Sequence, residues 1–441
     1  MDWKHLLTTK RFGMERYHDE KHDGRTEFQR DYDRLIFSPA FRRLQNKTQV
    51  FPLPGSGFVH NRLTHSLEVA CVGRSLGFAV SSALTEKYGQ SYPHLSEIGS
   101  IVAAACLAHD LGNPPFGHSG EKAIATFFSE GNTHAIKSQL SDSEWSDFVN
   151  FEGNANAFRL LTTQFKGRRV GGFALTYSTL ASIVKYPYES QFADKKKSKF
   201  GFFQSEKQSF EVLASELGLI KSPKDTNRYV RHPLVYLVEA ADDICYQVMD
   251  IEDAFKLLLL SFEETKQILL SFLSADRQRR ANEIFSLVTD RNEQIAYLRS
   301  SVIGTLIDAC AQVFIENEEK ILAGEFEKSL IENVNNELDL VYKNTSKIAF
   351  DKVYTSQIVL DVELAGFKII KELLEIIIDA ALSPEKAYSK QILNRIPQQY
   401  NIYSESIYEK IQAVLDFVSS TTDVYALDLY RKINGMSLPD L

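Results

Sequence analysis

The chain has 441 residues, of which 44% are hydrophobic and 24% are charged, with 12 Pro and 22 Gly. This composition is that of a folded globular protein, and it excludes a disordered, collagen-like or membrane-embedded chain. The formal net charge of -8 argues against a dedicated duplex-DNA binder, because such proteins carry an excess of basic residues. An anionic ligand would have to be met by a local basic patch.

The first distinctive local pattern lies at residues 48–60, TQVFPLPGSGFVH, where two short β-prone runs flank a Pro/Gly turn. This pattern predicts a small β-hairpin. After it, apolar residues recur at i, i+3 and i+4, which predicts helices. The predicted helices span residues 62–86, 97–110, 119–130, 206–218, 232–260, 263–274 and 278–290.

The same helical period continues from about residue 291 to residue 435, as in AGFKIIKELLEIIIDAAL. We therefore expect an all-α protein. Because the residues singled out below for chemistry lie before residue 290, we predict a large helical core over residues 1–290. Residues 291–441 are then a helical C-terminal region packed on that core.

The four cysteines are Cys71, Cys106, Cys245 and Cys310, which are far apart and lie in apolar helical text. They are expected to be reduced core residues of a cytoplasmic protein. The N-terminal residues lack the apolar run of a signal peptide, and no stretch approaches about 18 uninterrupted apolar residues. We therefore expect a cytoplasmic location and no membrane partner.

Histidine-aspartate dipeptides occur at residues 18–19, 22–23 and 109–110. The first two lie in a polar segment, where solvated side chains are expected. The third, His109 and Asp110, ends the apolar helix SIVAAACLAHD and precedes the helix-stopping loop LGNPPFG. Both side chains should therefore be desolvated, and a buried carboxylate is costly unless it is paired, hydrogen-bonded or bound to a metal.

Two further polar residues fall on apolar helical stripes. His65 shares its stripe with Val69 and Val72, a position where a hydrogen-bonded core histidine is the commoner finding. Asp242 falls on the apolar stripe of the helix 232–260, whereas Asp243 lies on its polar face.

One divalent cation would satisfy His65, His109, Asp110 and Asp242 together. Two imidazoles and two carboxylates suit Mn, Fe, Mg or Zn, with positions left for water and a phosphate oxygen.

His118 and Glu121 follow at the start of the next helix, three residues apart and therefore neighbours. In isolation such a pair indicates helix capping plus a surface carboxylate. Beside a metal site, a hydrogen-bonded His-Glu couple would instead transfer protons. A lysine run, Lys195, Lys196, Lys197 and Lys199, is expected to be a solvated loop rather than a phosphate contact.

The order His65, His109-Asp110, Asp242 resembles the H…HD…D signature of HD-domain metal-dependent phosphohydrolases. Several longer segments look like the bacterial deoxyguanosinetriphosphate triphosphohydrolases, the dGTPase and dNTPase branch. These segments span about residues 25–255 and are RDYDRLIFSPAFRRLQNKTQVF, HNRLTHSLEVA, AHDLGNPPFGHSGEKAI, FEGNANAFRLL, KYP, KFGFFQSE and RHPLVYLVEAADDICY. The last 190 residues carry no motif that matches.

This resemblance implies hydrolysis of a 2′-deoxynucleoside 5′-triphosphate to deoxynucleoside and inorganic triphosphate, by metal-assisted water attack at the α-phosphorus. It implies a divalent cofactor, Mg²⁺ or Mn²⁺ first and Fe, Ni or Zn as alternatives. His118 and Glu121 match the catalytic His-acid couple. Gln45 matches a glutamine that contacts the sugar 3′-hydroxyl, and Tyr246 matches a tyrosine that packs on the deoxyribose and leaves no room for a 2′-hydroxyl.

The predicted triphosphate contacts are Arg42, Arg43, Arg62 and Lys185. Arg62 precedes His65 by three residues and so shares its helical face. The resemblance also suggests a homo-oligomer and, at a second site, an effector nucleotide or single-stranded DNA.

Two other functions stay open from the sequence. One is a different HD nucleotidase or phosphodiesterase, which would cleave a monophosphate or a cyclic ester. The other is a nucleotide-sensing or single-strand-binding protein with a vestigial metal site, against which the intact set of chemical residues argues. No pattern in the sequence identifies which base is preferred.

Overall fold

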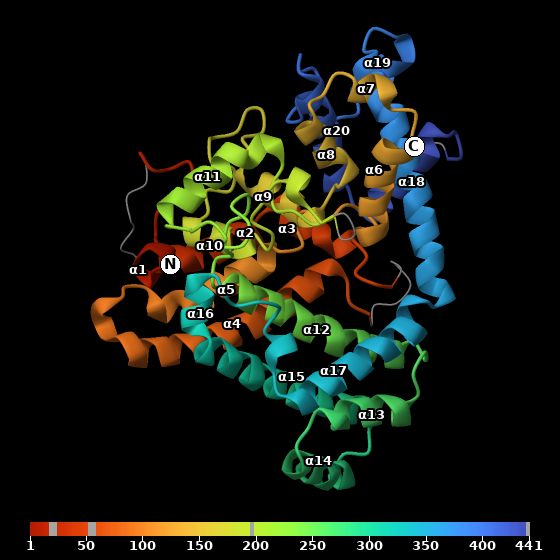
Figure 1. Ribbon diagram of the computed structural model, residues 1–441. Coiled ribbons are helices and arrows are strands. Elements are labelled where there is room, and N and C mark those ends of the chain that lie inside the picture. The colour runs from red at the N-terminus through yellow and green to blue at the C-terminus, as the bar shows by residue number, and fades with distance from the viewer. Residues whose placement is uncertain (17–23, 52–58, 195–197, 438–441) are drawn as a thin grey trace.

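The computed structural model describes residues 1–16, 24–51, 59–194 and 198–437. Its described residues form helices joined by loops, with no strand and with isolated bridges only (Figure 1). The all-α prediction is therefore confirmed.

The helices of the first half are α1 (Trp3–Leu6), α2 (Glu27–Ile36), α3 (Pro39–Arg43), α4 (Arg62–Tyr88), α5 (Ile98–Ala108), α6 (Gly117–Glu130), α7 (His134–Lys137), α8 (Asp142–Val149), α9 (Gly153–Thr162), α10 (Tyr177–Ile183) and α11 (Lys207–Glu216). Those of the second half are α12 (Val235–Lys256), α13 (Phe262–Ser271), α14 (Ala275–Leu287), α15 (Arg291–Glu316), α16 (Glu318–Ala323), α17 (Asn336–Ala349), α18 (Gln357–Leu382), α19 (Ala387–Leu393), α20 (Ile407–Ser420) and α21 (Asp423–Ile433).

The helix that begins the predicted metal site has a well-defined start. Asn61 precedes α4, and its side chain accepts a hydrogen bond from the Thr64 backbone N–H, while the Thr64 hydroxyl accepts one from the Asn61 N–H. This reciprocal pair satisfies two backbone donors that a helix start leaves free. It fixes where the first turn of α4, with Arg62 and His65, begins.

The predicted β-hairpin at residues 48–60 is wrong. Its turn, residues 52–58, lies outside the described residues, but the described flanks form no strand. They contribute one isolated antiparallel bridge between Thr48 and Asn61. The Thr48 backbone N–H instead donates to the Asp423 carboxylate at 2.8 Å. This backbone N–H group would be needed for a longer ladder of β-type hydrogen bonds, but the contact with the C-terminal region already engages it.

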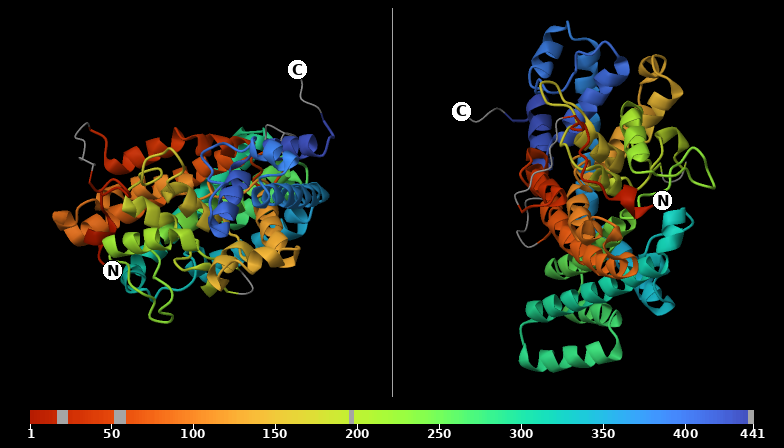
Figure 2. Two further views of the ribbon diagram at one scale, coloured as in Figure 1. Left: turned by 90° about the horizontal axis from the view of Figure 1, so that it is seen from above. Right: turned by 90° about the vertical axis from the view of Figure 1, so that its left-hand side faces the viewer.

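Two apolar clusters organise the molecule. The first is built around α4, α5, α12 and α15, with α2 against α5. The second lies between α6, α8, α18 and α20. In Figure 1 the long helix α18 runs along one side of the molecule and past α6. Figure 2 shows that α13 and α14 project from the rest of the body. The predicted boundary between residues 290 and 291 stays a prediction.

The cysteine prediction needs one correction. All four thiols are free, and Cys106, Cys245 and Cys310 are buried, but Cys71 is exposed. Cys71 lies on α4 beside Ala70 and Val72, both buried. The Cys71 side chain itself points outward, because adjacent side chains on a helix point about 100° apart.

Two helices of the described chain, α4 and α15, are long and apolar enough to cross a membrane by length and composition. A buried core helix passes the same test, and α4 packs against α5, α12 and α15. The finding is weak evidence for a membrane span, and the expectation of no membrane partner stays a prediction.

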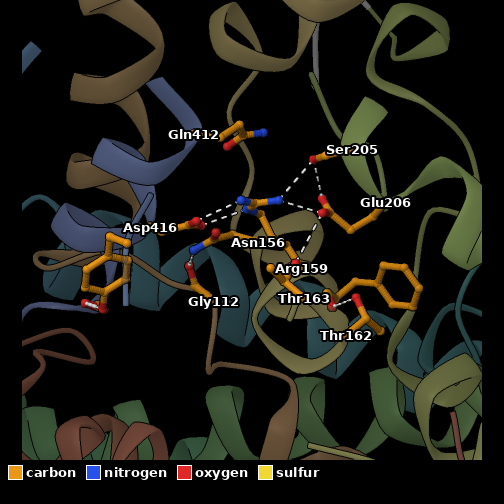
Figure 3. A network of polar contacts seen from close by, with 12 residues as sticks. Gly112, Asn156, Arg159, Thr162, Thr163, Ser205, Glu206, Gln412 and Asp416 are labelled. Carbon is orange, nitrogen blue, oxygen red and sulfur yellow. Dashed lines mark hydrogen bonds and ion pairs between the residues drawn. The ribbon is translucent and has the colours of Figure 1, made fainter. Parts of the chain in front are cut away.

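A buried ionic network joins the two halves of the chain (Figure 3). The Arg159 guanidinium of α9 donates to both carboxylate oxygens of Asp416 on α20, at 2.7 and 2.8 Å. It also donates to Glu206 at 2.6 Å. All three residues are buried. Replacing both members of such a pair by apolar groups often changes the stability little. Removing only one member is costly, because it leaves a buried uncompensated charge.

The substitution Asp416→Ala should therefore lower the free energy of unfolding by about 3 kcal/mol or more. The matched control is Asp428→Ala, because Asp428 pairs with Lys432 at 2.8 Å on the exposed face of α21, where such pairs contribute less than about 0.5 kcal/mol. Urea unfolding of both variants measures the difference. Equal losses in the two variants would contradict a structural role for the network.

Candidate metal and phosphate site

Four helices bring the predicted site residues together. α4 carries Arg62 and His65, the end of α5 leads into His109 and Asp110, and α12 carries Asp242. The loop after Asp110 then turns into α6, which begins at Gly117. The site therefore lies where the central helices of the first core meet the start of α6.

Three of the four predicted metal ligands form one group of donors. One ligand atom each from His65, His109 and Asp242 lie within 4.8 Å of one another. His65 Nε2 is 3.0 Å and His109 Nε2 is 3.5 Å from the Asp242 Oδ1 atom. Asp110 Oδ1 also lies 3.5 Å from His109 Nε2.

The donors of this group fit a divalent cation. His109 Nδ1 lies 2.6 Å from the Cys106 backbone oxygen, so it carries the hydrogen of that bond. Its Nε2 atom is buried and, among the described residues, has no hydrogen-bond partner. Such a second partner typically fixes the tautomer of a metal-binding histidine and leaves the other nitrogen free to coordinate.

The charges within the site support one another. Burial lowers the pKa of His109, but Asp110 and Asp242 outweigh this effect and raise it to about 9. Burial opposes ionisation of Asp242, yet His109 and His65 hold its pKa well below its usual range. Without a metal, the negative charges of Asp110 and Asp242 thus favour the protonated form of His109. A bound cation would replace that proton.

Asp110 is held by two neighbours. Its Oδ2 atom accepts a hydrogen bond from Arg62 Nη1 at 2.7 Å, and its Oδ1 atom accepts one from Asn113 Nδ2 at 2.5 Å. Gly117 makes room for the arginine, because a Cβ atom at this position would lie 2.4 Å from Arg62 Nη2. Gly117 also has φ +54°, a conformation that other residues rarely adopt.

A cavity of about 260 Å³ opens at these residues. Eight of the residues predicted for the site line it: Arg62, His109, Asp110, His118, Glu121, Lys185, Asp242 and Tyr246. His65 contacts Asp242 directly behind this lining. Arginine and lysine side chains therefore face the same space as the metal donors, as a site for a phosphate ester requires.

His118 and Glu121 both line the cavity, but no described hydrogen bond joins them. The Glu121 Oε1 atom instead accepts from the Gly153 backbone N–H at 2.8 Å. A Cβ atom at Gly153 would lie 2.6 Å from that oxygen, so glycine is required for the contact. Burial raises the pKa of Glu121.

The imidazole of His118 is open to the cavity. Desolvation by the surrounding protein lowers its pKa, and the charges of Arg62 and Lys199 lower it further. Its neutral form is therefore favoured at neutral pH, which suits a proton acceptor.

Lys185 and Tyr246 are each held by a neighbouring side chain. Lys185 Nζ lies 3.1 Å from Glu239 Oε1, and this carboxylate raises the lysine pKa against the effect of burial. The Tyr246 ring stacks on Tyr354, with ring centroids 5.5 Å apart. The Tyr354 hydroxyl in turn donates to Asp250 at 2.5 Å.

The structure places three predicted contacts elsewhere. Gln45 and Arg42 are exposed and do not line this cavity. Arg43 lines a different cavity. The other two His-Asp dipeptides lie in residues 17–23, and Lys195, Lys196 and Lys197 belong to 195–197, both outside the described residues.

Two cavity residues escaped the sequence reasoning. Gln49 lines the cavity, and its buried Oε1 atom has no partner among the described residues. Lys199, expected to be solvated, lines the cavity with Nζ 2.5 Å from Glu152 and 4.0 Å from Glu121. The lysine run did indicate a local excess of positive charge, but neither periodicity nor spacing showed which lysine side chain points into the cavity.

Comparisons with known proteins agree with this geometry. Residues 62–151 match the HD domain and residues 333–432 match the phosphohydrolase-associated domain. A deoxyguanosinetriphosphate triphosphohydrolase-like protein of Pseudomonas aeruginosa (strain LESB58) is 39% identical over the full length of both chains. One of Synechocystis sp. is 38% identical over 99% of this chain and 100% of its own length.

A deoxyguanosinetriphosphate triphosphohydrolase of Yersinia enterocolitica is 29% identical over 98% of this chain and 99% of its own length. The HD match begins at Arg62 and includes His65, His109 and Asp110, the residues that converge on the cavity. The chain belongs to the deoxyguanosinetriphosphate triphosphohydrolase family of HD-domain phosphohydrolases.

Proposed function

We propose that this protein hydrolyses a 2′-deoxynucleoside 5′-triphosphate to the deoxynucleoside and intact inorganic triphosphate. The observation that carries the proposal is one cavity that joins the donors His65, His109 and Asp242 to basic side chains and to His118. The names of the relatives point to the same substrate class.

The proposed metal ligands are His65, His109, Asp110 and Asp242. A divalent cation, Mg²⁺ or Mn²⁺ first, would supply Lewis acidity at a phosphoryl oxygen when bound. Arg62 and Asn113 keep the Asp110 carboxylate oriented, and the Cys106 carbonyl keeps the His109 ring oriented. These contacts thus hold two of the four proposed ligands in a fixed orientation.

The reaction needs water to add to the α-phosphorus and the bond from that phosphorus to O5′ to break, with a proton delivered to the leaving oxygen. In the proposed mechanism, neutral His118 accepts the proton of the attacking water. Glu121 does not reach His118 through a described hydrogen bond. It acts on the electrostatics of the cavity together with Lys199 and Glu152.

Arg62, Lys185 and Lys199 are proposed to hold the triphosphate, since all three line the cavity. Tyr246, backed by Tyr354, is proposed to pack on the deoxyribose. Gln49 replaces Gln45 in the proposal, because Gln49 lines the cavity and its side chain, whose amide oxygen has no described partner, suits a sugar hydroxyl.

A homo-oligomer, a cytoplasmic location, and an effector nucleotide or single-stranded DNA at a second site are proposals that rest on the family resemblance. The native metal and the preferred base are left to measurement.

The products distinguish this proposal from another HD phosphohydrolase. Incubation with Mn²⁺ or Mg²⁺ and each dNTP should release deoxynucleoside and inorganic triphosphate in equal amounts, measured by ion-pair chromatography. Pyrophosphate or orthophosphate in place of triphosphate would favour a different nucleotidase or phosphodiesterase. The absence of any turnover with every metal and dNTP would favour a binding protein.

Asp242→Ala should abolish stoichiometric metal binding, because Asp242 is the carboxylate shared by both histidines. Its neighbour on α12 is the matched control, and Asp243→Ala should retain the metal. Metal content after dialysis, measured by mass spectrometry, tests both. Asp110→Ala is expected to behave like Asp242→Ala, and retention of the metal would leave Asp110 only as the partner of Arg62.

His118→Ala should keep the metal and lose a factor of about 10²–10⁴ in kcat, the range for a general acid-base group. The steady-state rate and the metal content are measured on the same preparation. Near-normal kcat would remove His118 from the mechanism, whereas loss of the metal would make its effect indirect.

A further inference from the structure

A second cavity, of about 290 Å³, lies beside the first. The described linings of the two cavities share no residue. They adjoin at the loop after Asp110, since Leu111 lines the second cavity and Asn113 lines the first. The lining of the second cavity also includes residues of the C-terminal region, among them Tyr400 and Ser419.

Three cationic side chains line this second cavity: Arg43, Lys47 and Arg168. Arg43 is half-buried, and its guanidinium makes no hydrogen bond or ion pair with any described residue. Burial lowers the pKa of Arg43, and the charge of Arg168 lowers it further. An arginine that has lost part of its hydration without gaining a partner is stabilised when an anion binds to it.

Lys47 is buried, with an exposed fraction of 2%. Its Nζ atom donates to the Asn113 and Ser419 backbone oxygens, at 2.5 and 2.7 Å. Both acceptors are neutral, and an ammonium group has a third N–H to donate. Burial lowers the pKa of Lys47 to about 7, although the charge of Asp423 raises it. The Asp423 carboxylate also accepts hydrogen bonds from two backbone N–H groups.

Little negative charge within the lining balances these cations. Arg168 donates one hydrogen bond, to the neutral amide oxygen of Gln399 at 3.2 Å. Asp416 is the one acidic residue in the described lining. Both of its oxygens accept from Arg159, as Figure 3 shows. The described part of the cavity therefore carries an excess of positive charge.

We propose that this second cavity binds a phosphate-bearing anion, whose oxygens contact Arg43, Lys47 and Arg168. Guanidinium groups match the geometry of phosphate oxygens, and a partly dehydrated cavity strengthens the contact. The lining also includes the aromatic side chains of Phe165, Phe173 and Tyr400. These side chains can hold the base of a nucleotide, whereas inorganic triphosphate would use the basic side chains alone.

The test is calorimetric titration of the full-length, metal-free protein with inorganic triphosphate in the presence of a chelator. Two saturable sites per chain are expected, because the first cavity is itself proposed to hold a triphosphate. Arg168→Gln should weaken one of them by about tenfold or more, the loss expected for a charge-assisted hydrogen bond. The matched control is Arg169→Gln, because Arg169 is the exposed neighbour and does not line the cavity. It should bind as the unaltered chain does.

Titration with dGTP identifies the source of the phosphate. Tighter binding than that of triphosphate, lost in Arg168→Gln, supports a nucleotide held by the aromatic side chains, and equal binding supports a free polyphosphate. Lys185→Gln, in the first cavity, should weaken the other site and leave the Arg168-dependent site unchanged. No saturable binding of either probe, or a single site that Lys185→Gln weakens and Arg168→Gln leaves unchanged, would overturn the proposal. None of these outcomes depends on turnover, so the proposed function is tested separately.

Discussion

The position of the partly buried Asp242 carboxylate between His65 and His109 is the constraint on which the site depends. A carboxylate among apolar helices is unfavourable unless positive charge accompanies it. His109 supplies that charge as a proton before a metal binds. The pairing of α4 with α5 and α12 must therefore be accurate, because a small shift would separate the carboxylate from the two histidines.

The C-terminal region helps to hold the loop between Asp110 and His118. Asp423 accepts hydrogen bonds from the backbone N–H groups of Phe116 and Thr48, at 3.0 and 2.8 Å. Phe116 has a left-handed φ of 62°, which costs energy in a residue other than glycine. These bonds offset that cost. The phosphohydrolase-associated domain, which includes Asp423, thereby takes part in shaping a site to which it supplies no described lining residue.

Helical periodicity predicted the elements that carry the chemistry, because α4, α6 and α12 each bury a stripe that repeats at 3.6 residues, whereas α5 is apolar and buried along nearly its whole length. The same periodicity separated Asp242 from Asp243. It could not place residues 42–49, where α3 ends at Arg43, a 3₁₀ turn follows over Leu44–Asn46, and the chain then becomes extended. Gln49 therefore enters the cavity while Gln45 stays exposed, and Arg43 turns toward the second cavity. The failed hairpin has a similar origin, since Asp423, which accepts from the Thr48 backbone N–H, belongs to the distant helix α21.

The central claim is hydrolysis at the α-phosphorus by water that His118 activates. Turnover of dGTP in water labelled with ¹⁸O tests it most directly, with the products analysed by mass spectrometry. The account predicts one ¹⁸O atom in the inorganic triphosphate and none in the deoxynucleoside, because the bond from the α-phosphorus to O5′ is the one that breaks. Label in the 5′-hydroxyl of the deoxynucleoside, or in orthophosphate or pyrophosphate as the direct product, would contradict it.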